Sequence, residues 1–115
     1  MKSTSITKDV DSAGNHTFVL NMEGTVKGGW AGTVLMTMTA VTADNKTGTY
    51  TASSAAYLTD GSVITSSGSG VSLAIGGHKW QINGTVLLSD GTPLALEGEL
   101  ELASRSLNAK VFAIS

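Results

Sequence analysis

Cysteine is absent from this chain of 115 residues, and proline occurs once. Without cysteine the chain cannot form a disulfide, a thiolate metal site, an iron–sulfur cluster or a cysteine nucleophile. Small secreted domains often use disulfides to compensate for a thin hydrophobic core. We therefore expect this chain to close a hydrophobic core of its own.

Charge is also scarce. Charged residues make up 14% of the chain, the formal net charge is −2, and the seven Lys and Arg residues are spread along the sequence. Nucleic-acid binders need clustered basic residues, so this composition excludes that class. The longest aliphatic or aromatic run, residues 111–114, is far too short for a membrane span, and we expect no signal peptide at the N-terminus. These features predict a cytoplasmic protein; the alternative is a secreted protein whose leader is missing from this chain.

Hydroxyl residues are what the chain has in abundance, with 14 Ser and 15 Thr, while 41% of the residues are hydrophobic. Thr, Val, Ile and Tyr favour strands, and no segment shows the 3.6-residue period of a helix. The length allows one domain, which we expect to span residues 1–115.

Turn signals recur at short intervals and separate segments of alternating polarity. Asp60-Gly61, Gly76-Gly77 and Asp90-Gly91 are close to the pairs preferred in two-residue hairpin loops. The alternation is clearest where Leu94, Leu96, Leu100 and Leu102 oppose Glu97, Glu99 and Glu101. The pattern predicts an all-β fold, a small antiparallel up-and-down barrel of seven or eight strands, with a two-sheet sandwich as the alternative. Short turns without a crossover favour the barrel, because closure removes both exposed edges.

The predicted inward face mixes large apolar residues with many small ones. An eight-stranded barrel is just wide enough for its side chains to fill it, or for one small ligand to occupy it. The sequence leaves both a ligand cavity and a packed core open. If there is a cavity, the candidate ligand-binding residues are Trp30, Met36, Met38, Ser54, Trp80 and Ile82.

Polar groups on the inward face are few, and no Asp or Glu is among them. This excludes a glycosidase-type carboxylate pair on the strands. His78 and Tyr50 are the candidate catalytic residues, since both can donate or accept a hydrogen bond near a ligand; the alternatives are a solvated turn histidine and a rim tyrosine. The inward polar set also includes Thr65 and Ser67, and we expect Ser62 to Ile75 to form one strand bent at Gly68 and Gly70. The chain has two histidines and no nucleotide-binding fingerprint, so we expect neither a metal site nor a cofactor.

Two functional hypotheses follow. The first is a barrel that binds a hydrophobic small molecule, and if it is an enzyme, a cofactor-independent isomerase or cyclase that acts by shape. The second is a structural or interaction module with a packed core and no ligand site. Outward apolar residues would also allow a homo-oligomer; they are Val19, Leu35, Val41, Leu87, Phe112 and Ile114.

Overall fold

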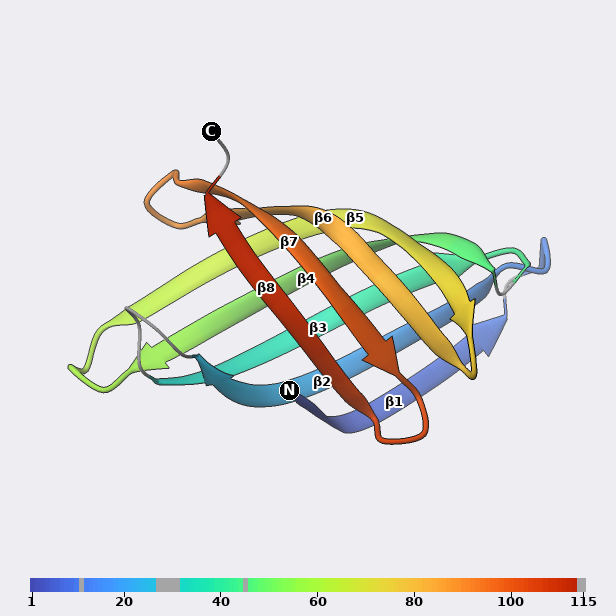
Figure 1. Cartoon of the computed structure of the whole chain (residues 1–115), viewed down its shortest axis with the longest axis horizontal. Coiled ribbons are helices and arrows are strands. Elements are labelled where there is room, and N and C mark those ends of the chain that lie inside the picture. The colour runs from blue at the N-terminus through green and yellow to red at the C-terminus, as the bar shows by residue number, and fades with distance from the viewer. Residues whose placement is uncertain (11, 27–31, 45, 114–115) are drawn as a thin grey trace.

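The chain folds into a closed barrel of antiparallel strands (Figure 1). The computed structural model describes residues 1–10, 12–26, 32–44 and 46–113. Within them, each strand pairs with the next along the chain, and the last returns to the first. The predicted up-and-down barrel is therefore confirmed, and one continuous ring of strands replaces the two sheets of the alternative sandwich. The eight strands are β1 (Lys2–Val10), β2 (His16–Val26), β3 (Gly32–Thr42), β4 (Thr47–Leu58), β5 (Val63–Gly76), β6 (Lys79–Leu88), β7 (Pro93–Glu101) and β8 (Ser106–Ala113).

No described segment forms a helix that could cross a bilayer.

Alternation of buried and exposed side chains runs unbroken along most of β5. The strand passes through Gly68 and Gly70 without a register shift, and its one irregularity lies between Ala74 and Gly76, where it pairs with β6. The predicted bend at Gly68 and Gly70 is therefore wrong. Thr65 and Ser67 are exposed on the outer face, and Ser66 takes the inward position instead.

Two Asp-Gly turns have the same construction, which differs from the two-residue loop expected. After β4, the Leu58 N–H donates to the Ser62 carbonyl (2.9 Å) and the Gly61 N–H donates to the Leu58 carbonyl (3.0 Å). The loop therefore holds three residues, with Gly61 at φ 90°, the conformation that glycine adopts without strain. The Asp60 carboxylate accepts the Ser62 N–H at 2.8 Å, which favours this longer loop. The turn around Asp90 and Gly91 repeats the arrangement.

The hydrogen bonds that three turn aspartates accept lead us to predict a loss of stability in acid. Hydrogen bonds from Ser62 and Thr92 hold the pKa values of Asp60 and Asp90 below their ordinary value of 3.8, and the Thr47 N–H does the same for Asp44. Because the folded-state pKa values are depressed, this stabilisation is present above pH 3.8 and is lost as the pH falls through the folded values. We expect the urea concentration at the unfolding midpoint to fall as the pH is lowered from about 4 through the depressed folded-state pKa values. Changing all three aspartates to asparagine should flatten that dependence; an equally steep fall in the variant would contradict the prediction.

The turn between β5 and β6 has two residues, as the sequence predicts, but the loop is shifted by one residue from the predicted pair Gly76-Gly77. Gly76 pairs with Lys79, which leaves Gly77 (φ 62°) and His78 (φ 57°) as the loop. Two successive positive φ values define a type I′ turn, whose twist matches that of the flanking strands. Leu102 differs from the sequence-based prediction, which places it on the inward face with Leu94, Leu96 and Leu100. In the structure it lies exposed in the turn after β7 and donates its N–H to the His78 carbonyl at 3.1 Å.

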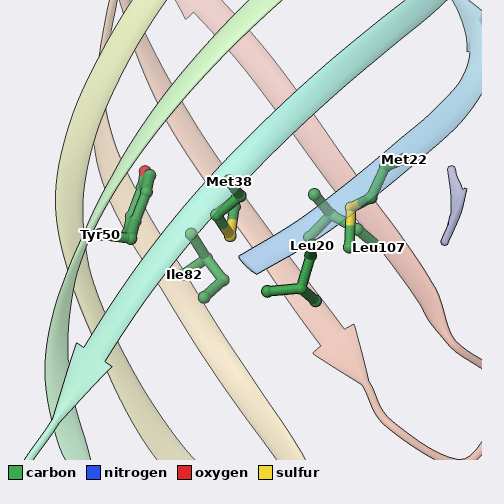
Figure 2. Packing of buried hydrophobic residues seen from close by; sticks show 6 residues of the cluster. All are labelled: Leu20, Met22, Met38, Tyr50, Ile82 and Leu107. Carbon is green, nitrogen blue, oxygen red and sulfur yellow. The ribbon is translucent and has the colours of Figure 1, made fainter. Parts of the chain in front are cut away.

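A cluster of six buried side chains forms the core inside the barrel (Figure 2). Ile82 is 1% exposed and lies among side chains from both sides of the ring. Trp80 and Met36 are partly buried and pack against the cluster. The predicted inward phase of β2, β3 and β6 is therefore correct. The cluster consists of Leu20, Met22, Met38, Tyr50, Ile82 and Leu107.

The ring closes through a short seam between β1 and β8. The two strands share one residue pair, Lys2 with Ser106, and diverge beyond it (Figure 1). Three backbone hydrogen bonds surround this pair: from Ser3 N–H to the Arg105 carbonyl (2.8 Å), and two that connect Met1 and Leu107 in both directions. On β8, the side chains from residue 108 to residue 113 are exposed, including those of the inward phase. The barrel is therefore closed at one end of the seam and open along the rest of it.

Candidate functional site

Beside the core cluster the structure contains a hollow of about 1450 Å³, and three residues of the cluster, Met38, Tyr50 and Leu107, line it. Its lining also includes outward residues such as Glu97 and Lys110, so it is open to solvent and its volume exceeds that of the barrel interior alone. The structure therefore contains an open hollow beside a packed core, and not an enclosed cavity. The inward residues that line it are Val34, Met36, Met38, Tyr50, Ala52, Ser54, Ala56, Ile64, Ser66, Gly68, Val86, Leu88, Leu94, Leu96, Gly98, Leu107, Ala109 and Val111.

Small residues create this space. At the inward positions of β4 and β5, Ala52 pairs with Gly68, and Ser54 pairs with Ser66. The next strands around the ring, β6 and β7, bring larger side chains such as Val86 and Leu94. An alanine or glycine at an inward position leaves unfilled the volume that leucine would occupy. The hollow therefore exists because the inward residues of β4 and β5 are small.

Four of the residues singled out from the sequence border the hollow: Met36, Met38, Ser54 and Tyr50. Ile82 and Trp80 do not line the hollow: Ile82 belongs to the core cluster and Trp80 packs against it. Trp30 and, among the outward apolar residues, Ile114 lie outside the described residues. Ser66, which sequence reasoning placed on the outer face, also borders the hollow; a strict two-residue alternation from Ile64 would have found it.

His78 and Tyr50 lie in different environments. His78 is exposed in the type I′ turn, with the left-handed backbone of its second position, and it is not among the residues that line the hollow. Tyr50 is 4% exposed and stands next to Met38 and Ile82 (Figure 2). Only one of the two candidate catalytic groups is thus placed beside the hollow.

The Tyr50 hydroxyl is buried and has no hydrogen-bond partner. Burial raises the pKa of this phenol above its ordinary value of 10.0, so that the group is a neutral donor at physiological pH. Its oxygen lies against Gly84, and a Cβ at that position would overlap it. Polar groups that are buried in proteins are nearly always hydrogen-bonded. An unpartnered hydroxyl beside a hollow is therefore unusual.

The other polar groups at the inward wall are satisfied. The hydroxyls of Ser54 and Ser66 form a short hydrogen bond with each other across β4 and β5. The remaining buried polar atom without a partner in the described residues, Nδ1 of His16, belongs to the start of β2 and does not line the hollow. Tyr50 is thus the one residue bordering the hollow whose buried polar atom lacks a partner, among those described.

Charge lies outside the barrel, as the sequence predicts for the glutamates. Lys79 contacts Glu101 at 3.3 Å and Glu99 at 3.7 Å on the outer face of β6 and β7. The hydrogen bond to Glu101 raises the pKa of Lys79 above its ordinary value. Within the described part of the chain, no three His, Asp or Glu side chains are grouped so that they could hold a metal ion.

The sequence matches no protein-family model and no curated protein, and the fold matches no solved structure.

Proposed function

We propose that the barrel binds a hydrophobic small molecule in the hollow beside its core. The observation that carries this proposal is the apolar character of the inward wall, where Val34, Ile64 and Leu88 surround the space left by small residues. Binding sites for small molecules are concave and mostly apolar, with a few polar groups that fix orientation. The packed core cluster would hold this wall rigid, so that little conformational entropy is lost on binding.

Binding rather than catalysis is the activity we infer. An isomerase or cyclase of the kind considered from the sequence would need polar groups converging on one substrate. Tyr50 borders the hollow, whereas His78 is exposed in a turn. The proposed ligand-binding residues are accordingly Met36, Met38 and Ser54, together with Tyr50 and Ser66.

A pair of serines on β5 gives a matched test. Ser66 faces the hollow and its neighbour Ser67 faces solvent, so the same change to leucine adds bulk to opposite faces of one strand. We expect wild type to bind an anilinonaphthalene sulfonate saturably, and S66L to bind it about tenfold more weakly, a loss of about 1.4 kcal/mol. The measurement is a fluorescence titration of each purified protein.

The control variant S67L should bind the probe as wild type does. If wild type gives no saturable signal, the barrel is better described as a structural module with no ligand site. If S66L and S67L bind equally well, the probe occupies another surface, and the hollow is not the binding site.

The outward apolar residues support a separate expectation of self-association. Leu35, Leu87 and Phe112 are exposed on β3, β6 and β8. Exposed apolar side chains mark interaction surfaces when they are contiguous and are ordinary when they are scattered. Sedimentation velocity over a range of protein concentrations distinguishes a monomer from a homo-oligomer.

A further inference from the structure

We infer that the ligand of this barrel is an apolar molecule with a neutral carbonyl oxygen, and that this oxygen accepts a hydrogen bond from the paired hydroxyls of Ser54 and Ser66. The inference rests on the proposed function and names the chemical class of the ligand. Both serines line the hollow, and they pair with each other across β4 and β5. The hydroxyl of Tyr50, the other polar group of this inward wall, is buried against Gly84, which does not line the hollow, so a ligand cannot reach it.

The serine pair has one hydroxyl hydrogen to spare. Each serine hydroxyl carries one hydrogen to donate and lone pairs that can accept. The hydrogen bond between Ser54 and Ser66 uses one of the two hydrogens, and neither hydroxyl has a further partner among the described residues. One O–H is therefore left without an acceptor in that part of the protein, whichever serine donates to the other. The pair can donate it to a ligand without giving up its own hydrogen bond.

The residues around the pair leave room for a ligand oxygen. The nearest inward positions on one side are Ala52 and Gly68, which pair with each other, and Ala56 follows on β4 on the other side. All three line the hollow, and both serines are themselves partly exposed although they face inward. Across the sheet the pair is flanked by Met36 on β3 and Leu88 on β6. A ligand on this wall would therefore meet apolar side chains around a single polar point.

The charge distribution selects a neutral ligand group. The inward residues that line the hollow contain no Lys or Arg to pair with a carboxylate and no Asp or Glu to pair with an ammonium group. Burying an unpaired charge is far more costly than burying a neutral carbonyl. A ligand that covers the spare O–H takes it out of contact with water, and affinity is lost if the ligand offers no acceptor in return. A carbonyl oxygen supplies that acceptor and has no hydrogen that needs a partner of its own.

A pair of fluorescent probes tests this inference. The first is a dimethylaminonaphthyl ethyl ketone, and the second is the same naphthalene with a propyl chain in place of the propionyl group. We expect the double variant S54A/S66A, which has no hydroxyl left at the pair, to bind the ketone about tenfold more weakly than wild type and the carbonyl-free probe at least as tightly. The emission of the bound ketone should also shift to shorter wavelength in this variant, because a hydrogen bond to the carbonyl moves it to longer wavelength. Each single alanine variant keeps one hydroxyl as a donor and should lose less affinity for the ketone than the double variant.

Two controls separate the possible outcomes. The double variant S67A/S69A removes two exposed hydroxyls from the outer face of β5 that do not line the hollow, and it should leave both affinities unchanged. Unliganded S54A/S66A should unfold at nearly the same urea concentration as wild type, since both partners of one hydrogen bond are removed together. If neither probe binds wild type, the proposed binding function is wrong. If both bind and S54A/S66A changes neither the affinity nor the emission of the ketone, or weakens both probes equally, the function stands and the carbonyl inference is overturned.

Discussion

Replacing Ile82 by alanine is expected to lower the free energy of unfolding by about 4 kcal/mol, the upper part of the range for large-to-small changes in a core. Ile82 is 1% exposed and lies in the core cluster with Met38 and Tyr50. The strand that carries Ile82 cannot move in to fill the space, because β6 is held along its length by β5 on one side and β7 on the other. The free-energy cost of the lost contacts and that of the cavity would therefore add.

The matched control is Ile75, an isoleucine on the outer face of β5 that is 49% exposed. I75A should cost less than about 1 kcal/mol, since surface substitutions away from special features have small effects. Urea unfolding followed by far-ultraviolet circular dichroism gives both values. Equal losses for I82A and I75A would show that the cluster does not behave as a packed core.

Replacing Gly70 by alanine should also be severely destabilising, by about 3 kcal/mol, although it adds only one methyl group. A Cβ at Gly70 would overlap the carbonyl oxygen of Asn83 and the Cα of Gly84 on the neighbouring strand. Backbone atoms cannot rotate away as a side chain can, so β5 and β6 would have to move apart where they pair. The change would also displace Tyr50, which pairs with Gly70 on the other side.

Gly24 provides the comparison for this prediction. A Cβ there would meet the side chain of Met1, with its Cγ at 2.6 Å and its Cα at 3.0 Å. The nearest atom, Cγ, belongs to a flexible side chain that can rotate aside, so G24A should cost about 1 kcal/mol or less. Thermal unfolding of both variants tests the difference, and a G70A protein as stable as G24A would contradict the close approach of β5 and β6.

The barrel was predictable from sequence because its strands are short, alternate in polarity and are joined by recognisable turns. The glutamates of β7 show why, because three charged side chains at every second position must face solvent and so assign both faces of the strand. Ser66 and Ser67 show the limit, since neighbouring serines carry no hydrophobic contrast to mark the inward phase. His78 shows another limit, because its left-handed backbone comes from the type I′ turn rather than from its own preference.

The hollow itself could not be predicted from the sequence. Small inward residues are compatible with a narrow, filled barrel and with an open one, and the outcome depends on how the strands pair around the ring. The unpartnered hydroxyl of Tyr50 depends in the same way on a contact between β4 and β6, which are not neighbours in the sheet. No pattern along one strand reports such a contact.

The short seam between β1 and β8 has a consequence for solubility. Beyond the pair of Lys2 with Ser106, each strand keeps one edge that no other described strand covers, and such edges are templates for aggregation. The strands opposite the seam, β3 to β5, contain no charged residue, whereas β1 and β8 carry Lys2, Lys8, Asp9 and Lys110. In a chain so poor in charge, these side chains oppose the docking of another strand onto the open edges, and so help to keep one molecule from extending the sheet of the next.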